Sequence, residues 1–301
     1  MKKLFSFFAI VMFLSLYLNA NSQVLVNPGA ISYPTLGQAF VAINSGVHTG
    51  VVSCLVTGST VETIPAFLNS SGTGSASYIS VTVTTSVVAT IEGNLTGASV
   101  INLVGADNVI IDGSIGGVGR NLTVRNNSNG SNATAIWLSS ISATPDSNGC
   151  TNNIIRNLEI SCNARVDSSA LSTFGILAGG STIGNVAGRN NDNNRFLNNR
   201  IIKCRYGILL NGGAAANRSD NNIISGNIVG PDLAGTDNIG KAGIFAQFQD
   251  NCMINDNVVQ NVGGTFAGTT GGADRIGIGA GSESWSSTPT TTTGGNYTVM
   301  R

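Results

Sequence analysis

Two aspartates stand at matching places in consecutive repeats of this chain, and they are its best candidates for chemistry. Asp220 and Asp250 are each followed directly by Asn. Oxygen ligands on adjacent coils could share a Ca²⁺, and a nearby Arg218 could act as the base of a lyase. Our alignment gives no third carboxylate, because the matching positions hold Asn193, Thr151 and Ala106. Solvated turn carboxylates are therefore favoured over a Ca²⁺ site, and no other cofactor is expected.

Acid–base cleavage of a glycosidic bond needs two carboxylates that flank the same bond. Asp112 and Asp256 share a position in our alignment, but three coils separate them. The single histidine, His48, precedes the regular repeats. We therefore assign no catalytic residue from the sequence.

Asparagine recurs at one position of the repeat. We align Asn152, Asn194, Asn221 and Asn251 in one column, with Asp107 on an earlier coil. Parallel strands on successive coils lie about 4.8 Å apart, so identical amides can hydrogen-bond along the stack. We expect this column to stabilise the fold, because a ligand site would need a greater variety of groups.

Two of the 5 cysteines, Cys162 and Cys204, also fall at matching places. Stacked strand positions lie within the range of Cα separations that a disulfide accepts, and export would permit oxidation. The odd number of cysteines argues against a disulfide framework. A disulfide and a pair of stacked buried thiols are equal alternatives.

Isoleucine behind a small residue recurs roughly every 32–36 residues through the second half of the chain. The small–Ile pairs are Ala135-Ile136, Gly175-Ile176, Gly207-Ile208, Gly243-Ile244 and Gly277-Ile278. Apolar pairs alternate with them at Val109-Ile110, Ile154-Ile155, Phe196-Leu197, Ile223-Ile224 and Met253-Ile254. Such self-similarity predicts a solenoid of about 7–10 coils, with the small–Ile isoleucines stacked inside and the small residues at tight corners.

The residue after each of these isoleucines should point the other way, because side chains alternate along a strand. The positions hold Trp137, Leu177, Leu209 and Phe245. If exposed, such a stripe would offer a platform for sugar rings or for a partner protein. The alternative is that a loop or another part of the chain covers it.

The two ends of the chain differ from its middle. Lys2, Lys3, an apolar run at 4–18 and small residues at 20–22 are typical of a signal peptide over 1–22. An N-terminal cap over 23–74 should contain a helix at 33–44, with Thr35 and Gln38 as a capping box. We expect coils over 75–281 and a Ser/Thr/Gly-rich linker, or the start of a further region, over 282–301.

Composition narrows the class of protein. Of the 301 residues 42% are hydrophobic and only 10% charged, and the 15 basic residues balance the 15 acidic ones. A neutral chain without a basic cluster is unsuited to capturing nucleic acid. After removal of the signal peptide, no segment is expected to span a membrane.

The phrase Gly207-Ile208-Leu209-Leu210, followed by residues 221–228 (Asn-Asn-Ile-Ile-Ser-Gly-Asn-Ile), resembles the repeat of right-handed parallel β-helices. Together with the signal peptide, the helix at 33–44 and residues 105–113, it is similar to large secreted bacterial surface proteins of the adhesin type, which share the pectate-lyase-like fold. The resemblance implies an all-β solenoid at the cell surface or outside the cell. It also implies a non-catalytic scaffold that binds a glycan or a surface protein, with a polysaccharide lyase or glycoside hydrolase as the alternative.

Overall fold

The computed structural model describes residues 22–141, 148–163, 173–213, 217–263, 275–281 and 297–299. The expected signal peptide lies outside these residues apart from Ser22, and the expected terminal linker does so apart from Tyr297–Val299. Among the described residues, no helix is both long and apolar enough to cross a membrane.

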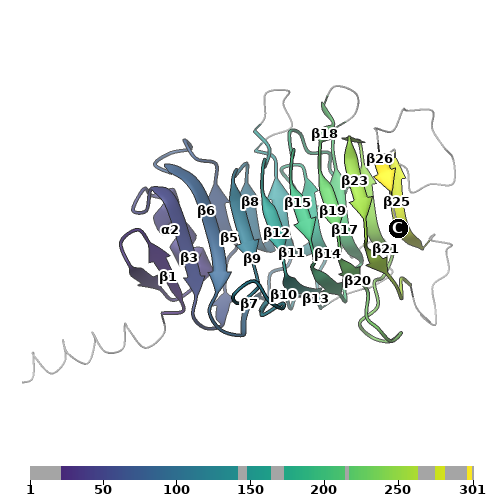
Figure 1. The fold of residues 1–301 in the computed structure, drawn as a ribbon, viewed down its shortest axis with the longest axis horizontal. Helices are drawn as coiled ribbons and strands as arrows, with labels where there is room; N and C mark the ends of the chain where they lie inside the picture. The colour runs from purple at the N-terminus through teal and green to yellow at the C-terminus, as the bar shows by residue number, and fades with distance from the viewer. Residues whose placement is uncertain are drawn as a thin grey trace, which may run out of the picture.

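The described chain is a parallel β-helix built from three long sheets (Figure 1). Sheet A contains, in spatial order, β2 (Ile31–Tyr33), β1 (Val24–Asn27), β3 (Gly50–Val56), β6 (Tyr78–Thr85), β9 (Val109–Asp112), β12 (Ile154–Arg156), β15 (Arg195–Leu197), β19 (Ile223–Ser225), β23 (Cys252–Asn255) and β26 (Tyr297–Val299). Sheet B contains β4 (Thr60–Glu62), β7 (Ala89–Gly93), β10 (Leu122–Asn126), β13 (Leu158–Cys162), β16 (Arg200–Ile202), β20 (Ile228–Val229) and β24 (Val258–Val259). Sheet C contains β5 (Ala66–Asn69), β8 (Ser99–Val104), β11 (Ala133–Ser139), β14 (Thr173–Gly179), β17 (Tyr206–Asn211), β21 (Ala242–Gln247) and β25 (Ile276–Gly281).

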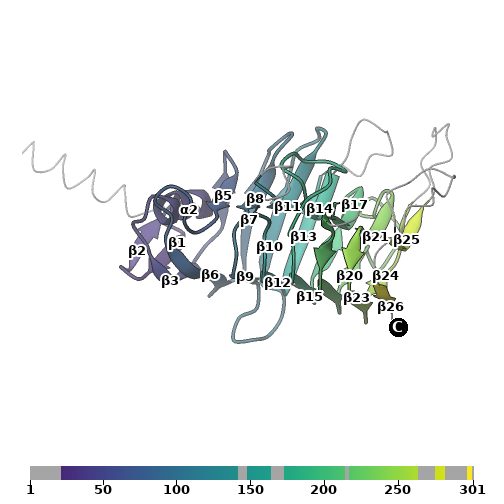
Figure 2. The ribbon, with the colours of Figure 1, turned by 90° about the horizontal axis from the view of Figure 1, so that it is seen from above.

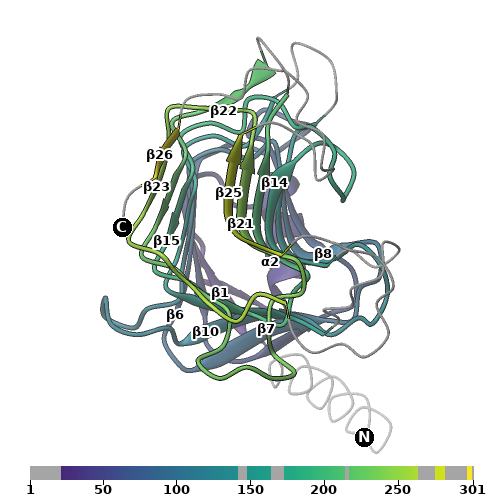
Figure 3. The same ribbon diagram turned by 90° about the vertical axis from the view of Figure 1, so that its right-hand side faces the viewer.

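Each coil passes through sheets A, B and C in that order, and its strands pair in parallel with those of the next coil. Seen along the axis in Figure 3, the three sheets enclose one continuous interior. A short pair, β18 (Ser219–Asp220) and β22 (Gln249–Asp250), adds a fourth line of contact at the corner before sheet A. The parallel strands of the successive coils confirm the predicted all-β solenoid.

The first coil is formed by β3, β4 and β5, so parallel pairing begins at Gly50, ahead of the predicted start at residue 75. The strands β1 and β2 pair in antiparallel fashion at the N-terminal edge of sheet A. The sequence between β3 and β5 lacks the small–Ile motif of the later coils, so the repeat pattern alone does not distinguish it from the cap.

The N-terminal helix is α2 (Leu36–Asn44), which Figure 2 places at the N-terminal end of the solenoid. The Thr35 hydroxyl accepts the Gln38 N–H at 3.2 Å, as the capping motif predicted. The carboxylate of Glu62, on the first coil, accepts the N–H groups of Leu36 and Gly37 at 3.0 Å each. The helix thus has its orphan N-terminal donors satisfied by the coil that it covers.

The predicted isoleucine stack is confirmed. Ile136, Ile176, Ile208, Ile244 and Ile278 are paired in series across β11, β14, β17, β21 and β25. The first four are fully buried, while Ile278, on the last described strand of sheet C, is 40% exposed. Burial of each is worth about 1.5–3 kcal/mol.

The small residues before these isoleucines lie within the strands of sheet C, so the predicted position at tight corners is wrong. At Gly207 and Gly243, sheets B and C approach each other closely. A Cβ on Gly207 would lie 2.4 Å from Val229 Cγ1, and one on Gly243 would lie 2.3 Å from Val259 Cγ1. Neither glycine has a positive φ. Glycine is therefore required there by packing.

Candidate functional site

The predicted stripe on sheet C is aligned as expected but is not an exposed platform. Trp137 pairs with Leu177, Leu177 with Leu209, and Leu209 with Phe245. Leu177 and Leu209 are fully buried, Phe245 is 6% exposed and only Trp137 remains half-buried. Of the two alternatives for this stripe, an exposed platform and a covered one, the structure contains the covered one.

The stripe belongs to a second hydrophobic layer on the outer side of sheet C. Phe174 and Tyr206, on adjacent coils, stack with ring centroids 5.1 Å apart and planes 12° apart. Ile183, from the segment after β14, packs against the same layer, and the Arg205 guanidinium lies 5.4 Å from the Tyr206 ring centroid. Apolar side chains that are already covered contribute packing energy, so this layer stabilises sheet C.

The two candidate aspartates do lie side by side, since Asp220 pairs with Asp250 across β18 and β22. Arg218 Nη1 lies 3.2 Å from Asp250 Oδ1 and 3.3 Å from Oδ2. Burial, and then the negative charge of Asp250, raise the pKa of Asp220 above its ordinary value. At this corner the carboxylate of Asp250 is paired with Arg218, and that of Asp220 is exposed.

A third carboxylate, which the alignment missed, joins this corner. Asp192 Oδ1 accepts the Asp220 N–H at 2.7 Å. The backbone carbonyl groups of Asp192 and Asp220 each accept an asparagine N–H from the preceding coil. Burial raises the pKa of Asp192, with the charge of Asp220 adding to it. Even so, no cluster of three His, Cys, Asp or Glu side chains that could hold a metal ion occurs in the described ranges.

The alignment error arose from two strands, β15 and β9, each of which was displaced by one residue. Arg195 pairs with Ile154 and with Ile223, so Phe196 matches Ile155 rather than Ile154. Alignment on the first residue of the apolar pairs Phe196-Leu197 and Val109-Ile110 displaces both coils by one residue, because the true partners of Ile154 are Arg195 and Ile110. The outward position can be Ile or Arg because it faces solvent, and the apolar pair was therefore a misleading marker.

The asparagines of the predicted column consequently fall in two columns. Asn152, Asn221 and Asn251 share an exposed outer column with Asn193, and all of them have a positive φ of 53–58°. In this outer column Asn221 Nδ2 donates to Asn193 Oδ1 at 3.2 Å, and Asn251 Nδ2 donates to Asn221 Oδ1 at 2.7 Å. The amide pairing is as predicted for Asn221 and Asn251, and wrong for Asn194.

Asn194 belongs to an inner column at the same corner. Its Oδ1 accepts the Asn153 N–H at 3.1 Å, and its own N–H donates to Asn222 Oδ1 at 2.8 Å. All three side chains are buried. Each amide therefore replaces the missing backbone partners of a neighbouring coil.

A second inner column, which the sequence analysis did not identify, follows sheet A. Asn199 donates its N–H to Asn227 Oδ1 at 2.9 Å, and Asn227 donates its N–H to Asn257 Oδ1 at 3.0 Å. Asn199 Nδ2 donates to the Ile155 carbonyl at 2.9 Å. Asn199 and Asn227 lie five residues after Asn194 and Asn222 of the first inner column, and this repeated spacing was the signal that could have revealed them.

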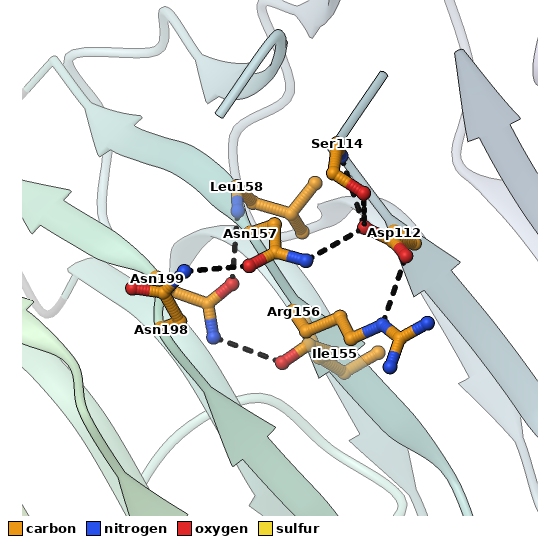
Figure 4. A network of polar contacts seen from close by, with 8 residues as sticks. All are labelled: Asp112, Ser114, Ile155, Arg156, Asn157, Leu158, Asn198 and Asn199. Carbon is orange, nitrogen blue, oxygen red and sulfur yellow. Dashed lines mark hydrogen bonds and ion pairs between the residues drawn. The ribbon is translucent and has the colours of Figure 1, made fainter. Parts of the chain in front are cut away.

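Asp112 is part of a polar network on sheet A rather than of a carboxylate pair (Figure 4). It pairs in register with Arg156, whose Nε donates to Asp112 Oδ2 at 2.9 Å. Asp112 Oδ1 accepts from Ser114 N at 2.9 Å and from Asn157 Nδ2 at 2.9 Å. The predicted alignment of Asp112 with Asp256 is wrong because Ile110, rather than Val109, pairs with Ile154, so this coil was displaced by one residue.

All five cysteines are buried free thiols. Burial, together with contact with Cys162, raises the pKa of Cys204 well above its ordinary value. Cys162 Sγ lies 3.2 Å from the Phe174 carbonyl and Cys204 Sγ 3.2 Å from the Ile202 carbonyl. Of the two alternatives for this pair, the structure contains the stacked thiols.

The outer face of sheet A is the surface that sequence reasoning missed. Its central row consists of Ile110, Ile154, Arg195, Ile223 and Met253, paired in series. The three isoleucines are half-buried, and Met253 and Arg195 are exposed. In the part of the chain that the structure describes, no strand or helix lies outside this wall (Figure 3).

Comparison with known proteins adds little to this geometry. No protein-family model matches the chain, and no curated protein matches it. Among solved structures, it is similar to the crystal structure of the Dettilon tailspike protein, at 15% identity and a TM-score of 0.28, over 81% of this chain and 55% of that chain. It is the pairing of its own strands that identifies the protein as a parallel β-helix.

Proposed function

We propose that the protein is a secreted or cell-surface scaffold without catalytic activity, which binds an extracellular glycan or a surface protein. The observation that carries the proposal is the use of the candidate acids. Asp192 accepts a hydrogen bond from the next coil, Asp250 pairs with Arg218, and Asp112 is held by several donors. Carboxylates occupied in this way join coils and are poorly placed to transfer protons.

The experiment is an assay for polysaccharide cleavage. Purified protein is incubated with Ca²⁺ and a panel of acidic and neutral polysaccharides, while unsaturated products and reducing ends are followed. We expect neither to be released. Release that disappears in Asp220→Ala but persists in Asp256→Ala, an exposed aspartate on another corner, would contradict the proposal.

A polysaccharide lyase is the second candidate, and one observation favours it. Asp192, Asp220 and Asp250 follow one another on consecutive coils, with Arg218 beside them. Three carboxylates and a cation at one edge are groups that a lyase could use for binding and proton abstraction. The same cleavage assay separates the two candidates, because only the lyase forms unsaturated ends.

The proposed location outside the cytoplasm rests on the N-terminal sequence, with its two lysines, apolar run and small residues. Expression of the full chain in a bacterial host, followed by fractionation and N-terminal mass spectrometry, tests it. We expect exported protein that begins near Gln23. A full-length chain that stays in the cytoplasm would contradict export.

A further inference from the structure

We infer that the outer face of sheet A binds a carboxylate-bearing polysaccharide that lies along the axis of the solenoid. The inference rests on the proposed binding function and names its surface and ligand class. The row Ile110, Ile154, Arg195, Ile223 and Met253, called here the sheet A row, runs parallel to that axis.

The first argument is the unpaired cation at the centre of the row. Arg195 is exposed and forms no ion pair within the described part of the chain, whereas Arg125, Arg156, Arg200 and Arg218 each pair with a carboxylate. Its neighbours on either side are Ile154 and Ile223. A guanidinium flanked by apolar side chains suits a planar carboxylate attached to a ring that has an apolar face.

The second argument is the repeat of the row. Its side chains recur once per coil, at about 4.8 Å. The rings of an extended polysaccharide repeat at a similar spacing, so successive rings can contact successive coils. Ile154, Ile223 and Met253 supply the apolar contacts, and the outermost side chain, Met253, is 37% exposed.

The third argument is that polar groups border the row on both sides. On one side are the exposed amides of Asn193, Asn221 and Asn251. The amide ladder uses Oδ1 of Asn193, Nδ2 of Asn251 and both atoms of Asn221 once each, and an amide can form more hydrogen bonds than these. On the other side, the segment before β10 is fixed across the coils by Arg120, which donates to the Asn198 carbonyl at 2.6 Å. The hydroxyl groups at both edges of a polysaccharide bound over the row could therefore form hydrogen bonds with these polar groups.

A second copy of this chain is a less suitable occupant. A two-fold contact centred on the row would bring two Arg195 guanidinium groups together without a carboxylate of the row to compensate them. The exposed carboxylate of Asp220 would repel an acidic polymer at the corner next to the amides. Such a polymer would therefore lie over the strands of sheet A.

The test is affinity electrophoresis of the full chain in gels containing polygalacturonate, alginate or hyaluronate, with methyl-esterified pectin and dextran sulfate as comparisons. We expect retardation by at least one carboxylated polymer and about tenfold weaker binding for Arg195→Gln, the loss typical of one charge-assisted pair. Ile223→Ser should also weaken binding. The matched control Arg125→Gln removes the same charge from sheet B, where Arg125 pairs with Glu92, and should bind like the wild type.

The inference would be overturned if no carboxylated polymer retarded the protein, if esterified pectin bound equally well, or if Arg195→Gln bound like the wild type. It would also be overturned if Arg125→Gln lost as much affinity as Arg195→Gln, or if Arg195→Gln weakened binding to dextran sulfate by the same factor. Either of these last two results would show non-specific charge attraction. Circular dichroism of each variant confirms folding. The cleavage assay measures unsaturated products and this assay measures binding. A failure of the binding inference can therefore be distinguished from a failure of the proposed non-catalytic function.

Discussion

Arg156 Nε donates to Asp112 Oδ2 at 2.9 Å across two adjacent coils, and this contact shows how the protein uses its few charges (Figure 4). Asp112 is 8% exposed and accepts further bonds from Ser114 and Asn157. Burial alone would raise its pKa, but these hydrogen bonds and the charge of Arg156 hold the pKa below its ordinary value.

A pH dependence follows from this lowered pKa. The stability contributed by Asp112 is present above the pKa of the unfolded chain and is lost as the pH falls through the folded-state pKa. We expect Asp112→Asn to lower stability by about 1–3 kcal/mol at neutral pH and by less in acid. Melting temperatures measured from neutral to acidic pH check this, with Asp256→Asn as the control. A constant difference across that range would contradict it.

The inner and outer asparagine columns should respond differently to substitution. Asn227 is fully buried and its Oδ1 accepts from the Asn199 backbone, so Asn227→Ala should cost about 1–3 kcal/mol for each partner left unsatisfied. Asn221 is exposed with φ 56°, so Asn221→Gly should be nearly neutral, while Asn221→Ala should cost about 1 kcal/mol through strain. Urea denaturation gives all three values, and equal losses for Asn227→Ala and Asn221→Gly would refute the distinction.

Close packing between sheets B and C predicts a contrast between two glycines of the same motif. A Cβ on Gly207 would lie 2.4 Å from Val229 Cγ1 and 2.5 Å from the Gly243 carbonyl, whereas one on Gly277 would have nothing within 4 Å. We expect Gly207→Ala to destabilise by about 1–3 kcal/mol or more and Gly277→Ala to change stability by less than about 0.5 kcal/mol. Thermal unfolding of both variants decides whether packing or position in the repeat matters.

Leu209 tests whether the stripe on sheet C is structural. Because this side chain is fully buried, Leu209→Ala should lower the free energy of unfolding by about 2–5 kcal/mol. Glycan binding per folded molecule should be unchanged. An unaltered melting temperature combined with lost binding would restore the stripe as a ligand platform.

The cysteines should be unreactive in the native protein. Burial raises the pKa of Cys54, Cys150 and Cys252 to about 12 each, and the thiolate is the reactive form. We expect no alkylation by iodoacetamide at mildly alkaline pH until denaturant is added, and then alkylation of every cysteine. A non-reducing digest that links Cys162 to Cys204 would show that the pair forms a disulfide instead.

The sequence by itself determined the solenoid and the interior of sheet C. Ile136, Ile176, Ile208 and Ile244 could be aligned because an interior position admits few side chains. The glycine before each of the last three is required because a Cβ there would meet a side chain of sheet B. The capping residue Thr35 was equally readable, since its hydrogen bond is local in sequence.

Only the tertiary structure decided the register of sheet A and the burial of outward side chains. An outward position tolerates Ile154, Arg195 or Ile223 alike, so sequence alone could not place the coil that contains Arg195, and Asp192 and Asn194 were misplaced with it. Whether Leu209 faces solvent depends on segments that fold over sheet C from elsewhere in the chain. Alternation along a strand gives the direction of a side chain, while its exposure depends on what packs against it.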